Sequence, residues 1–492
     1  MNGLKFRRQF LLSPFTTDGL LQWNQYTLGA YFLYTHPDLI VTQTKRSDKE
    51  IFLLGHVLDP KNHELSTLDI LNKIAEASSE SDTAKVLYGL VGRYVLIIKT
   101  GERLVFFNDA CGLKSFFYTQ YEGQLCLASQ PLLLKLVTGD LISKQERYYS
   151  YFESEYVKNS KEHWFPSGTS LYEKVHHLVP NHYLDSATMQ QIRYWPLEQL
   201  EIGDYETGLR KFSELLRQTL IAGSKKYNLA LGLTSGYDSR ILLSASKDVS
   251  ENMQYYTLLY RDLNCESNDV KIPTLLSKTL GIKYKKLDCR IELDERFKKR
   301  YLESTDMAHL DDWGYIAYGI SKKLTKDVVS VKGSCSETGR CFFYKNGKHP
   351  KLTAGDDILN INPKWKGIPF IVDRMHQWFD EVKESTVNKG YNILDLFHWE
   401  VSTGSWQSQS QMEWDLVHDT FTPFNNRELL DIMLHIDTKY RCKPNYTMYR
   451  DSMNILWPEV LSQPINPLTP KLALKAKLKS LLVEVGFEKY NK

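Results

Sequence analysis

The chain has 492 residues, which is too many for one ordinary hydrophobic core, so two or more domains are expected. Its 42% apolar and 25% charged residues are typical of a soluble globular protein. A net charge of +3 over this length excludes the strongly basic surface that nucleic-acid binding requires. No apolar run is long enough for a membrane-spanning helix, and the N-terminal segment lacks the features of a signal peptide.

The seven cysteines are odd in number and scattered, and none forms a Cys-x-x-Cys pair. A zinc site, an iron–sulfur cluster and a disulfide framework are therefore not expected. The composition predicts a protein of the reducing cytoplasm with no nucleic-acid or membrane partner. A homodimer is a possible assembly.

Residues 1–196 are predicted to form a layered β-sheet domain of the α+β class. Short runs of branched and aromatic residues, separated by polar breaks, indicate strands. The predicted strands are 28–32, 39–42, 51–54, 94–99 and 104–107, and the predicted helices are 68–76 and 130–137. An acidic, irregular stretch after Pro196 is typical of a linker.

From Tyr205 onward the pattern changes to strands that alternate with helices, which predicts an α/β domain with a parallel sheet over residues 205–492. The predicted strands are 229–233, 255–260, 282–287 and 328–331. A helix beginning near Asp269 is expected to end at Gly281. Ligands of such sheets bind at the carboxyl ends of the strands.

The loop that follows the first of these strands is the most informative segment of the chain. We select seven residues as nucleotide-binding: Leu233, Thr234, Ser235, Gly236, Tyr237, Asp238 and Ser239. Between an apolar strand and a helix, such a loop gathers backbone N–H groups, hydroxyls and the positive end of a helix dipole, which suits a polyphosphate. Asp238 can hold Mg²⁺ beside those phosphates. The alternative is an ordinary strand-to-helix turn.

The 234–239 loop resembles the Ser-Gly-Gly-x-Asp-Ser pyrophosphate loop of ATP-pyrophosphatases, with Thr234 for the first Ser and Ser235 for the first Gly. Residues 90–98, 104–109, 112, 116–118 and 169–195 are similar, in order, to the N-terminal domain of asparagine synthetase-like proteins. The resemblance implies a class II glutamine amidotransferase-like domain over 1–196. It also implies a HUP-like ATP-pyrophosphatase domain over 205–492.

In that family the amidotransferase nucleophile is a cysteine exposed by removal of the first Met, and its own amine serves as the base. This sequence has Asn2 at that place. The resemblance therefore implies a scaffold without glutaminase activity. We expect free ammonia or another amine, and not glutamine, to supply the nitrogen.

A second loop follows the predicted strand 328–331. Gly333, Glu337 and Arg340 match the family variant Gly-x-x-x-Glu-x-x-Arg, and the resemblance implies catalytic roles for Glu337 and Arg340. Ser336 stands where the family has a second magnesium-binding Asp. Either Glu337 takes that role or metal binding depends mainly on Asp238 and the phosphates. The alternative is that Glu337 and Arg340 form a solvated helix pair.

The C-terminal region offers further positive charge for a departing pyrophosphate. The candidates are Lys443, Arg450 and Lys471, between which the sequence does not choose. Residues 421–430 resemble a structural segment of the family. Residues 471–492 are predicted to form a basic, partly amphipathic helix that packs on the domain.

The resemblance implies an ATP- and Mg²⁺-dependent amide ligase, AMP-forming, that activates a carboxylate as an acyl-adenylate and transfers it to ammonia or an amine. The carboxylate belongs to a small molecule or a peptide. Asparagine biosynthesis is one reading, and a specialised substrate is preferred. Two alternatives stay open: another adenylating pyrophosphate-loop enzyme, and a non-catalytic relative that acts as a binding module.

Overall fold

A computed structural model describes residues 5–139, 145–160, 162–306, 308–325, 327–344, 350 and 352–467. Asn2, Lys471 and the basic helix predicted for 471–492 lie outside the described residues. None of the helices in the described part of the chain combines the length and apolar character needed to span a lipid bilayer.

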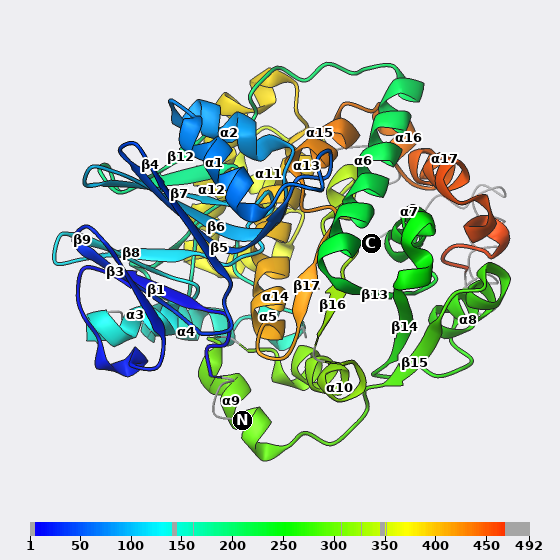
Figure 1. Ribbon diagram of the computed structural model, residues 1–492, viewed down its shortest axis with the longest axis horizontal. Coiled ribbons are helices and arrows are strands. Elements are labelled where there is room, and N and C mark those ends of the chain that lie inside the picture. The colour runs from blue at the N-terminus through cyan, green and yellow to red at the C-terminus, as the bar shows by residue number, and fades with distance from the viewer. Residues whose placement is uncertain are drawn as a thin grey trace.

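The N-terminal part of the chain contains two six-stranded antiparallel sheets (Figure 1). The first, in the order β10-β8-β9-β1-β3-β2, comprises β1 (Phe10–Ser13), β2 (Asn24–Leu28), β3 (Tyr31–Thr35), β8 (Phe117–Tyr121), β9 (Gln124–Ala128) and β10 (His176–His177). The second, in the order β12-β11-β7-β6-β5-β4, comprises β4 (Val41–Arg46), β5 (Lys49–Leu58), β6 (Val91–Thr100), β7 (Arg103–Asn108), β11 (His182–Asp185) and β12 (Gln190–Arg193). Helices cover the outer faces and give four layers.

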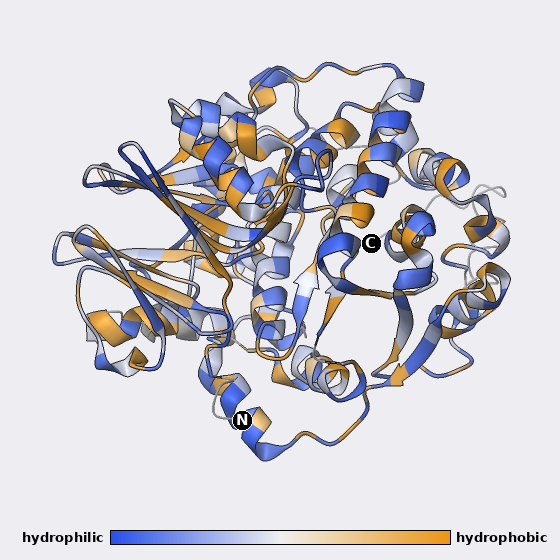
Figure 2. Ribbon diagram, viewed as in Figure 1, coloured by the Kyte–Doolittle hydropathy of each residue, from blue (hydrophilic) through white to orange (hydrophobic). Residues whose placement is uncertain are grey.

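The alternation of side chains along β5 explains these layers. Phe52 and Leu54 lie in the core between the two sheets, whereas Ile51 and Leu53 pack under the outer helices. Because both faces of the strand are buried, its sequence is an apolar run rather than an alternating pattern (Figure 2). The outer helices of this part are η1 (Asp18–Leu20), α1 (Thr67–Glu76), α2 (Glu80–Tyr88), α3 (Pro131–Thr138), α4 (Gln145–Phe152) and α5 (Glu155–Lys158).

The strand predicted at residues 28–32 is wrong in its placement. A hairpin turn lies there, between β2 and β3, and Gly29 has a φ of 64°. The apolar and aromatic residues Leu28, Tyr31 and Phe32 stand on both sides of the turn, so the sequence pattern predicts one strand where the chain reverses.

The C-terminal part of the chain contains one five-stranded parallel sheet, which confirms the α/β arrangement predicted for this part. Its order is β15-β14-β13-β16-β17, from β13 (Asn228–Gly232), β14 (Gln254–Leu259), β15 (Tyr284–Asp288), β16 (Val328–Val331) and β17 (Asp419–Phe421). Strand order reverses direction between β13 and β16, which are hydrogen-bonded neighbours. In open parallel sheets a ligand crevice forms at this kind of switch point, outside the carboxyl ends of the strands.

Helices surround the parallel sheet on both faces (Figure 1). Those before β16 are α6 (Tyr205–Lys226), α7 (Tyr237–Ala245), η3 (Lys247–Asn252), α8 (Asn268–Leu280), α9 (Glu295–Ser304), η4 (Leu310–Gly314) and α10 (Tyr315–Lys323). Those between β16 and β17 are η5 (Ser336–Arg340), α11 (Gly355–Leu359), η6 (Pro363–Gly367), α12 (Pro369–Ser385), η7 (Val387–Lys389), α13 (Ile393–Leu396), η8 (Phe397–Gln407) and α14 (Ser408–Trp414). Those after β17 are α15 (Arg427–Leu434), α16 (Thr438–Arg441), α17 (Thr447–Leu456) and η9 (Pro458–Ser462). As predicted, α8 ends at Gly281, which adopts a left-handed conformation.

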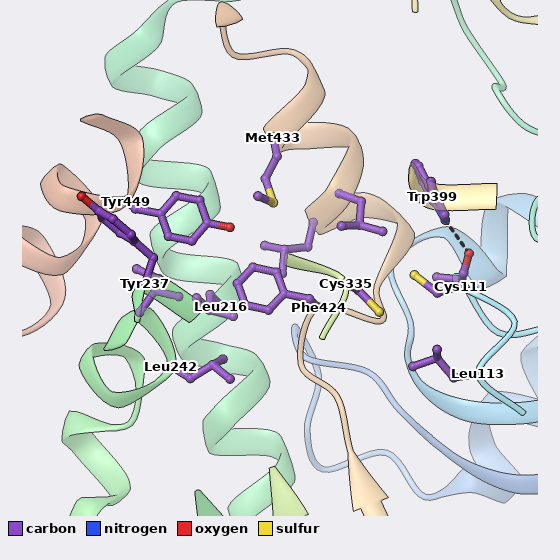
Figure 3. Packing of buried hydrophobic residues seen from close by; sticks show 14 of the residues in the cluster. Cys111, Leu113, Leu216, Tyr237, Leu242, Cys335, Trp399, Phe424, Met433 and Tyr449 are labelled. Carbon is purple, nitrogen blue, oxygen red and sulfur yellow. Dashed lines mark hydrogen bonds between the residues drawn. The ribbon is translucent and has the colours of Figure 1, made fainter. Parts of the chain in front are cut away.

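The two parts of the chain share one continuous apolar core (Figure 3). Cys111 and Leu113, from the turn after β7, lie in the same cluster as Phe424 and Trp399. The indole N–H of Trp399 donates to the carbonyl of Ala110 at 2.8 Å. The halves are therefore packed together as closely as elements within one domain.

A buried ionic cluster crosses the same interface. Arg93 of β6 donates two hydrogen bonds to the Asp415 carboxylate at 2.6 and 2.8 Å, and Lys114 Nζ reaches it at 3.2 Å. All three side chains are at most 5% exposed. Within a low-dielectric interior Asp415 is the carboxylate that pairs directly with both cations, and Asp419 adds a more distant negative charge.

We expect Asp415→Ala to lower the free energy of unfolding by about 3–5 kcal/mol, because it leaves two buried cations without their counter-charge. Chemical denaturation with Glu76→Ala as the control measures this effect. Glu76 pairs with Arg46 at 3.4 Å at the surface, where the side chains are 71% and 49% exposed, respectively. That control should cost less than about 1 kcal/mol. Equal effects of the two substitutions would contradict the role of the cluster.

Candidate active site

Two loops meet at the switch point of the parallel sheet. The 234–239 loop follows β13, and residues 332–340 follow β16. Gly333 brings them together, because a Cβ atom at this position would lie only 3.0 Å from the Cβ of Asp238. A larger residue at 333 would push the two loops apart.

The 234–239 loop is closed by its own hydroxyl groups. The N–H of Thr234 donates to Ser239 Oγ at 3.0 Å, and the two hydroxyl oxygens are also 3.0 Å apart. The N–H of Gly236 donates to Thr234 Oγ1 at 3.2 Å. Leu233 continues the sheet, with its N–H bound to the carbonyl of Tyr256 at 2.7 Å. The predicted strand–loop–helix context is present, and it fixes both hydroxyl side chains at the start of α7.

The start of α7 has the character of an anion site. Its N-cap is Gly236, which provides no side-chain hydrogen bond to the first turn. The N–H groups of residues 237–239 point out of the helix end, where they lack intrahelical partners. These amides and the helix dipole favour a negatively charged group at this position.

Ser235 differs from its neighbours, because both of its polar groups bind another helix. Its N–H and its hydroxyl donate to the same oxygen, Oδ1 of Asp269 in α8, at 2.9 and 2.6 Å. Ser235 is 5% exposed. The Ser235 side chain is thus accommodated by a carboxylate 34 residues away. The sequence marked Asp269 only as a helix start, and nothing in its local pattern indicates this contact.

Asp238 binds the second loop. Nη2 of Arg340 lies 2.8 and 2.9 Å from its two carboxylate oxygens, and the hydroxyl of Ser336 donates to Oδ1. Glu337 approaches the same guanidinium nitrogen, with Oε1 at 3.9 Å from Nη2. The structure therefore brings Asp238, Glu337 and Arg340 together. The solvated helix pair is not observed, since η5 is a short 3-10 segment and Arg340 is 9% exposed.

The guanidinium of Arg340 lies near two tyrosine rings and has an unused hydrogen-bond donor. Its guanidinium carbon lies 5.4 Å from the ring centre of Tyr446 and 5.7 Å from that of Tyr449. Within the described residues, buried Nε of Arg340 has no hydrogen-bond acceptor. A buried donor in this state is suited to a ligand oxygen.

Burial is the main reason that the pKa of Glu337 is raised, to about 7, and the negative charge of Asp238 adds to it. The positive charge of Arg340 acts in the opposite direction. A carboxyl group with a pKa near neutrality can exchange a proton during a reaction.

The remaining predicted residues are placed differently. Tyr237 faces away from the loop and packs against Tyr446 and Tyr449, with ring centres at 4.8 and 6.3 Å (Figure 3). Arg450 Nε donates to the Tyr237 hydroxyl at 3.1 Å, so it lies behind the same cluster. Lys443 is exposed, and among the described residues no hydrogen bond or ion pair joins it to the 234–239 loop.

The implied magnesium ion fits a site in which phosphate supplies most of the ligands. In the described part of the chain, no three His, Cys, Asp or Glu side chains are grouped for metal binding. Mg²⁺ is commonly held by one or two carboxylates together with substrate phosphates. Asp238 and Glu337 provide two partly exposed carboxylates, 29% and 20% exposed.

No protein-family model matches the chain, and no curated protein matches it. The solved structures that show a weak likeness include three enzymes. They are an NH3-dependent NAD synthetase from Campylobacter jejuni subsp. jejuni NCTC 11168 in complex with the nitrate ion (12% identity, covering 40% of this chain and 91% of that chain, TM-score 0.21), the allosteric regulatory enzyme of purine biosynthesis (10%, 74% and 87%, TM-score 0.26), and a glutamine phosphoribosylpyrophosphate amidotransferase from B. subtilis complexed with ADP and GMP (10%, 69% and 73%, TM-score 0.22). None of the three is named an asparagine synthetase. At these TM-scores, function has to be inferred from the residues of the site.

We expect Asp269→Ala to lower the free energy of unfolding by about 1–3 kcal/mol, because it leaves the part-buried N–H of Ser235 without its acceptor. Ser235→Ala is the matched control, since it keeps the N–H and removes only the hydroxyl. Denaturant titration of both variants measures the difference. An Asp269→Ala variant as stable as the wild type would show that this contact does not support the loop.

Proposed function

We propose that this chain is an ATP-dependent carbon–nitrogen ligase that adenylates a carboxylate and transfers the acyl group to ammonia or an amine. The observation that carries this proposal is the meeting of the 234–239 loop with Asp238, Glu337 and Arg340 at the switch point of the sheet. We assign residues 1–196 as an amidotransferase-like domain and 205–492 as a HUP-like synthetase domain of the asparagine synthetase type.

In the first half-reaction, the substrate carboxylate attacks the α-phosphorus of ATP and pyrophosphate leaves. In this proposal the amides at the start of α7, with the hydroxyls of Thr234 and Ser239, bind the leaving phosphates. When bound, Mg²⁺ would be held by Asp238 together with the phosphates and would offset the phosphate charge. The Ser235 contact with Asp269 keeps the loop in this shape.

Arg340 supplies a fixed positive charge at the same point. Asp238 holds Nη2 of its guanidinium, while Nε stays available for an oxygen of the nucleotide or of the acyl group. A preorganised donor of this kind stabilises charge that develops in the transition state.

In the second half-reaction, the amine attacks the acyl carbon and AMP leaves. Glu337 is the group that can accept the proton of the amine, because its raised pKa places the carboxylate and the acid within reach at neutral pH. The product is an amide, and the substrate is a carboxylate of a small molecule or a peptide.

The proposed nitrogen donor is ammonia or an amine rather than glutamine. Both cysteines in the described part of residues 1–196 are buried. Cys111 is 0% exposed, and its N–H binds Asn425. Burial raises the pKa of Cys126 to about 11, and its sulfur lies 3.7 Å from Ser13 Oγ. Neither thiol is in a state to attack glutamine.

Isotope exchange between pyrophosphate and ATP tests the adenylation step. With a panel of carboxylic acids, we expect the wild type to catalyse exchange. Asp238→Ala should lower the rate at least about 100-fold, because it releases Arg340 and removes the loop carboxylate. Asp248→Ala is the control, since Asp248 is a surface residue paired with Arg217.

Absence of exchange in the wild type with every acid would overturn the proposal and favour a binding module. Exchange that is stimulated by a sulfur acceptor or a nucleic acid, and by no carboxylate, would favour another adenylating enzyme.

The pH dependence of kcat/KM for amide formation tests Glu337. The rate should rise with pH through about 7 and then level off, because the group accepts a proton only when its carboxylate is ionised. Pyrophosphate exchange should lack this step, since no amine takes part in it. Glu337→Gln should remove the step and lower kcat by about 10²–10⁴-fold. A Glu337→Gln variant that keeps the same pH profile would exclude Glu337 as the base.

A further inference from the structure

Four of the seven cysteines form two thiol pairs, one at each end of η5. Cys335 precedes η5 and lies beside Cys111 in the shared core (Figure 3). Cys341 follows η5 and lies beside Cys442 in one small buried cluster. Both residues that flank η5 are left-handed, with φ values of 75° and 53°. The segment that carries Glu337 and Arg340 therefore has a pair of cysteines at each of its ends.

The two pairs differ in their surroundings. Cys111 and Cys335 are 0% exposed and lie in the shared core of the two halves. Cys341 and Cys442 lie in a small separate cluster with Tyr344 and Leu394, and Cys442 is 6% exposed. The second pair is thus the one closer to solvent.

We propose that Cys341 and Cys442 are a redox modification site, at which a peroxide converts the two thiols into a reversible disulfide. The inference rests on the pairing of the thiols at the end of η5 and does not require the ligase activity. Cytoplasmic disulfides are commonly transient ones of this type.

Exposure assigns the two roles. Cys442 is 6% exposed and Cys341 is 2% exposed, so Cys442 is the thiol that a peroxide reaches first. The positive charge of the neighbouring Arg441 favours the thiolate form of Cys442. Cys442 is therefore the nucleophile and Cys341 the resolving thiol.

The reaction balances with hydrogen peroxide as the oxidant. The Cys442 thiolate attacks one peroxide oxygen, the O–O bond breaks, and hydroxide leaves and is protonated to water. The sulfur of Cys341 then attacks the resulting sulfenic acid, the S–OH bond breaks, and the Cys341 proton leaves with the hydroxide as a second water. Together the thiols lose two electrons and two protons, and the peroxide is reduced to two waters.

The disulfide would join the second loop of the candidate site to the C-terminal helices. Arg441, beside Cys442, already donates to the carbonyl of Gly339 at 3.2 Å and to Asp395 at 3.1 Å. Tyr446, whose ring faces Arg340, donates its N–H to the carbonyl of Cys442 at 3.1 Å. An S–S bond of ~2.05 Å is shorter than any non-bonded sulfur contact, so its formation pulls these elements together.

Peptide mapping under non-reducing conditions tests the proposal on the full-length protein. After treatment with hydrogen peroxide and alkylation in denaturant, we expect one linked peptide pair containing Cys341 and Cys442. Two alkylatable thiols should be lost, and dithiothreitol should restore them. The background carries Cys265→Ser, because Cys265 is the exposed cysteine of the described chain and can link two molecules.

Two variants complete the design. Cys442→Ser should abolish the linked pair, whereas Cys335→Ser, the matched control in the deeper pair, should leave it intact. The wild-type map is informative even where a variant fails to fold. Full alkylation of Cys341 and Cys442 after oxidation would overturn the proposal, and so would a linked pair between Cys111 and Cys335.

Discussion

The fold depends on one fully satisfied buried carboxylate. Asp109, in the turn after β7, is 0% exposed and accepts hydrogen bonds from the N–H groups of Tyr94, Leu113 and Lys114 at 3.1, 2.8 and 2.9 Å. Its fourth donor is the side chain of Asn425, at 2.9 Å, from the segment after β17. A buried charge is tolerated only when it is bonded in this way, so the two halves of the chain must meet here.

This contact has consequences for the candidate site through the parallel sheet. The segment that carries Asn425 continues from β17, and β17 pairs with β16 through residues 329–331. The loop after β16 is therefore positioned from two sides, by the sheet and by the N-terminal layers. Gly333 then allows it to reach Asp238 across the switch point. The N-terminal part of the chain thus contributes to the geometry of the candidate site.

The sequence predicted what depends on neighbouring residues. Apolar runs located most strands, and the break at residues 234–239 located the loop, because burial and turn formation are recorded locally. The role of Ser235 could not be predicted, since its partner Asp269 is 34 residues away and carries no pattern. The thiol pairs were missed for the same reason, as Cys111 and Cys335 are joined only by the folded interface. The hairpin at Gly29 was missed for a different reason, because apolar residues on both sides of the turn have the pattern of one strand.

The second loop differs from the motif that its sequence resembles in a physically consistent way. An ionised Asp at position 336 would repel Asp238 and would call for another cation between them. Ser336 instead donates a hydrogen bond to Asp238, and the cation is Arg340, fixed by the chain itself. A guanidinium cannot lose its charge near neutral pH and offers several donors in a rigid plane. Among the described residues Nε of Arg340 has no acceptor, so the guanidinium keeps a donor free while it holds Asp238. The loop therefore has a hydroxyl where the motif has a carboxylate, and it keeps a fixed positive charge beside Asp238.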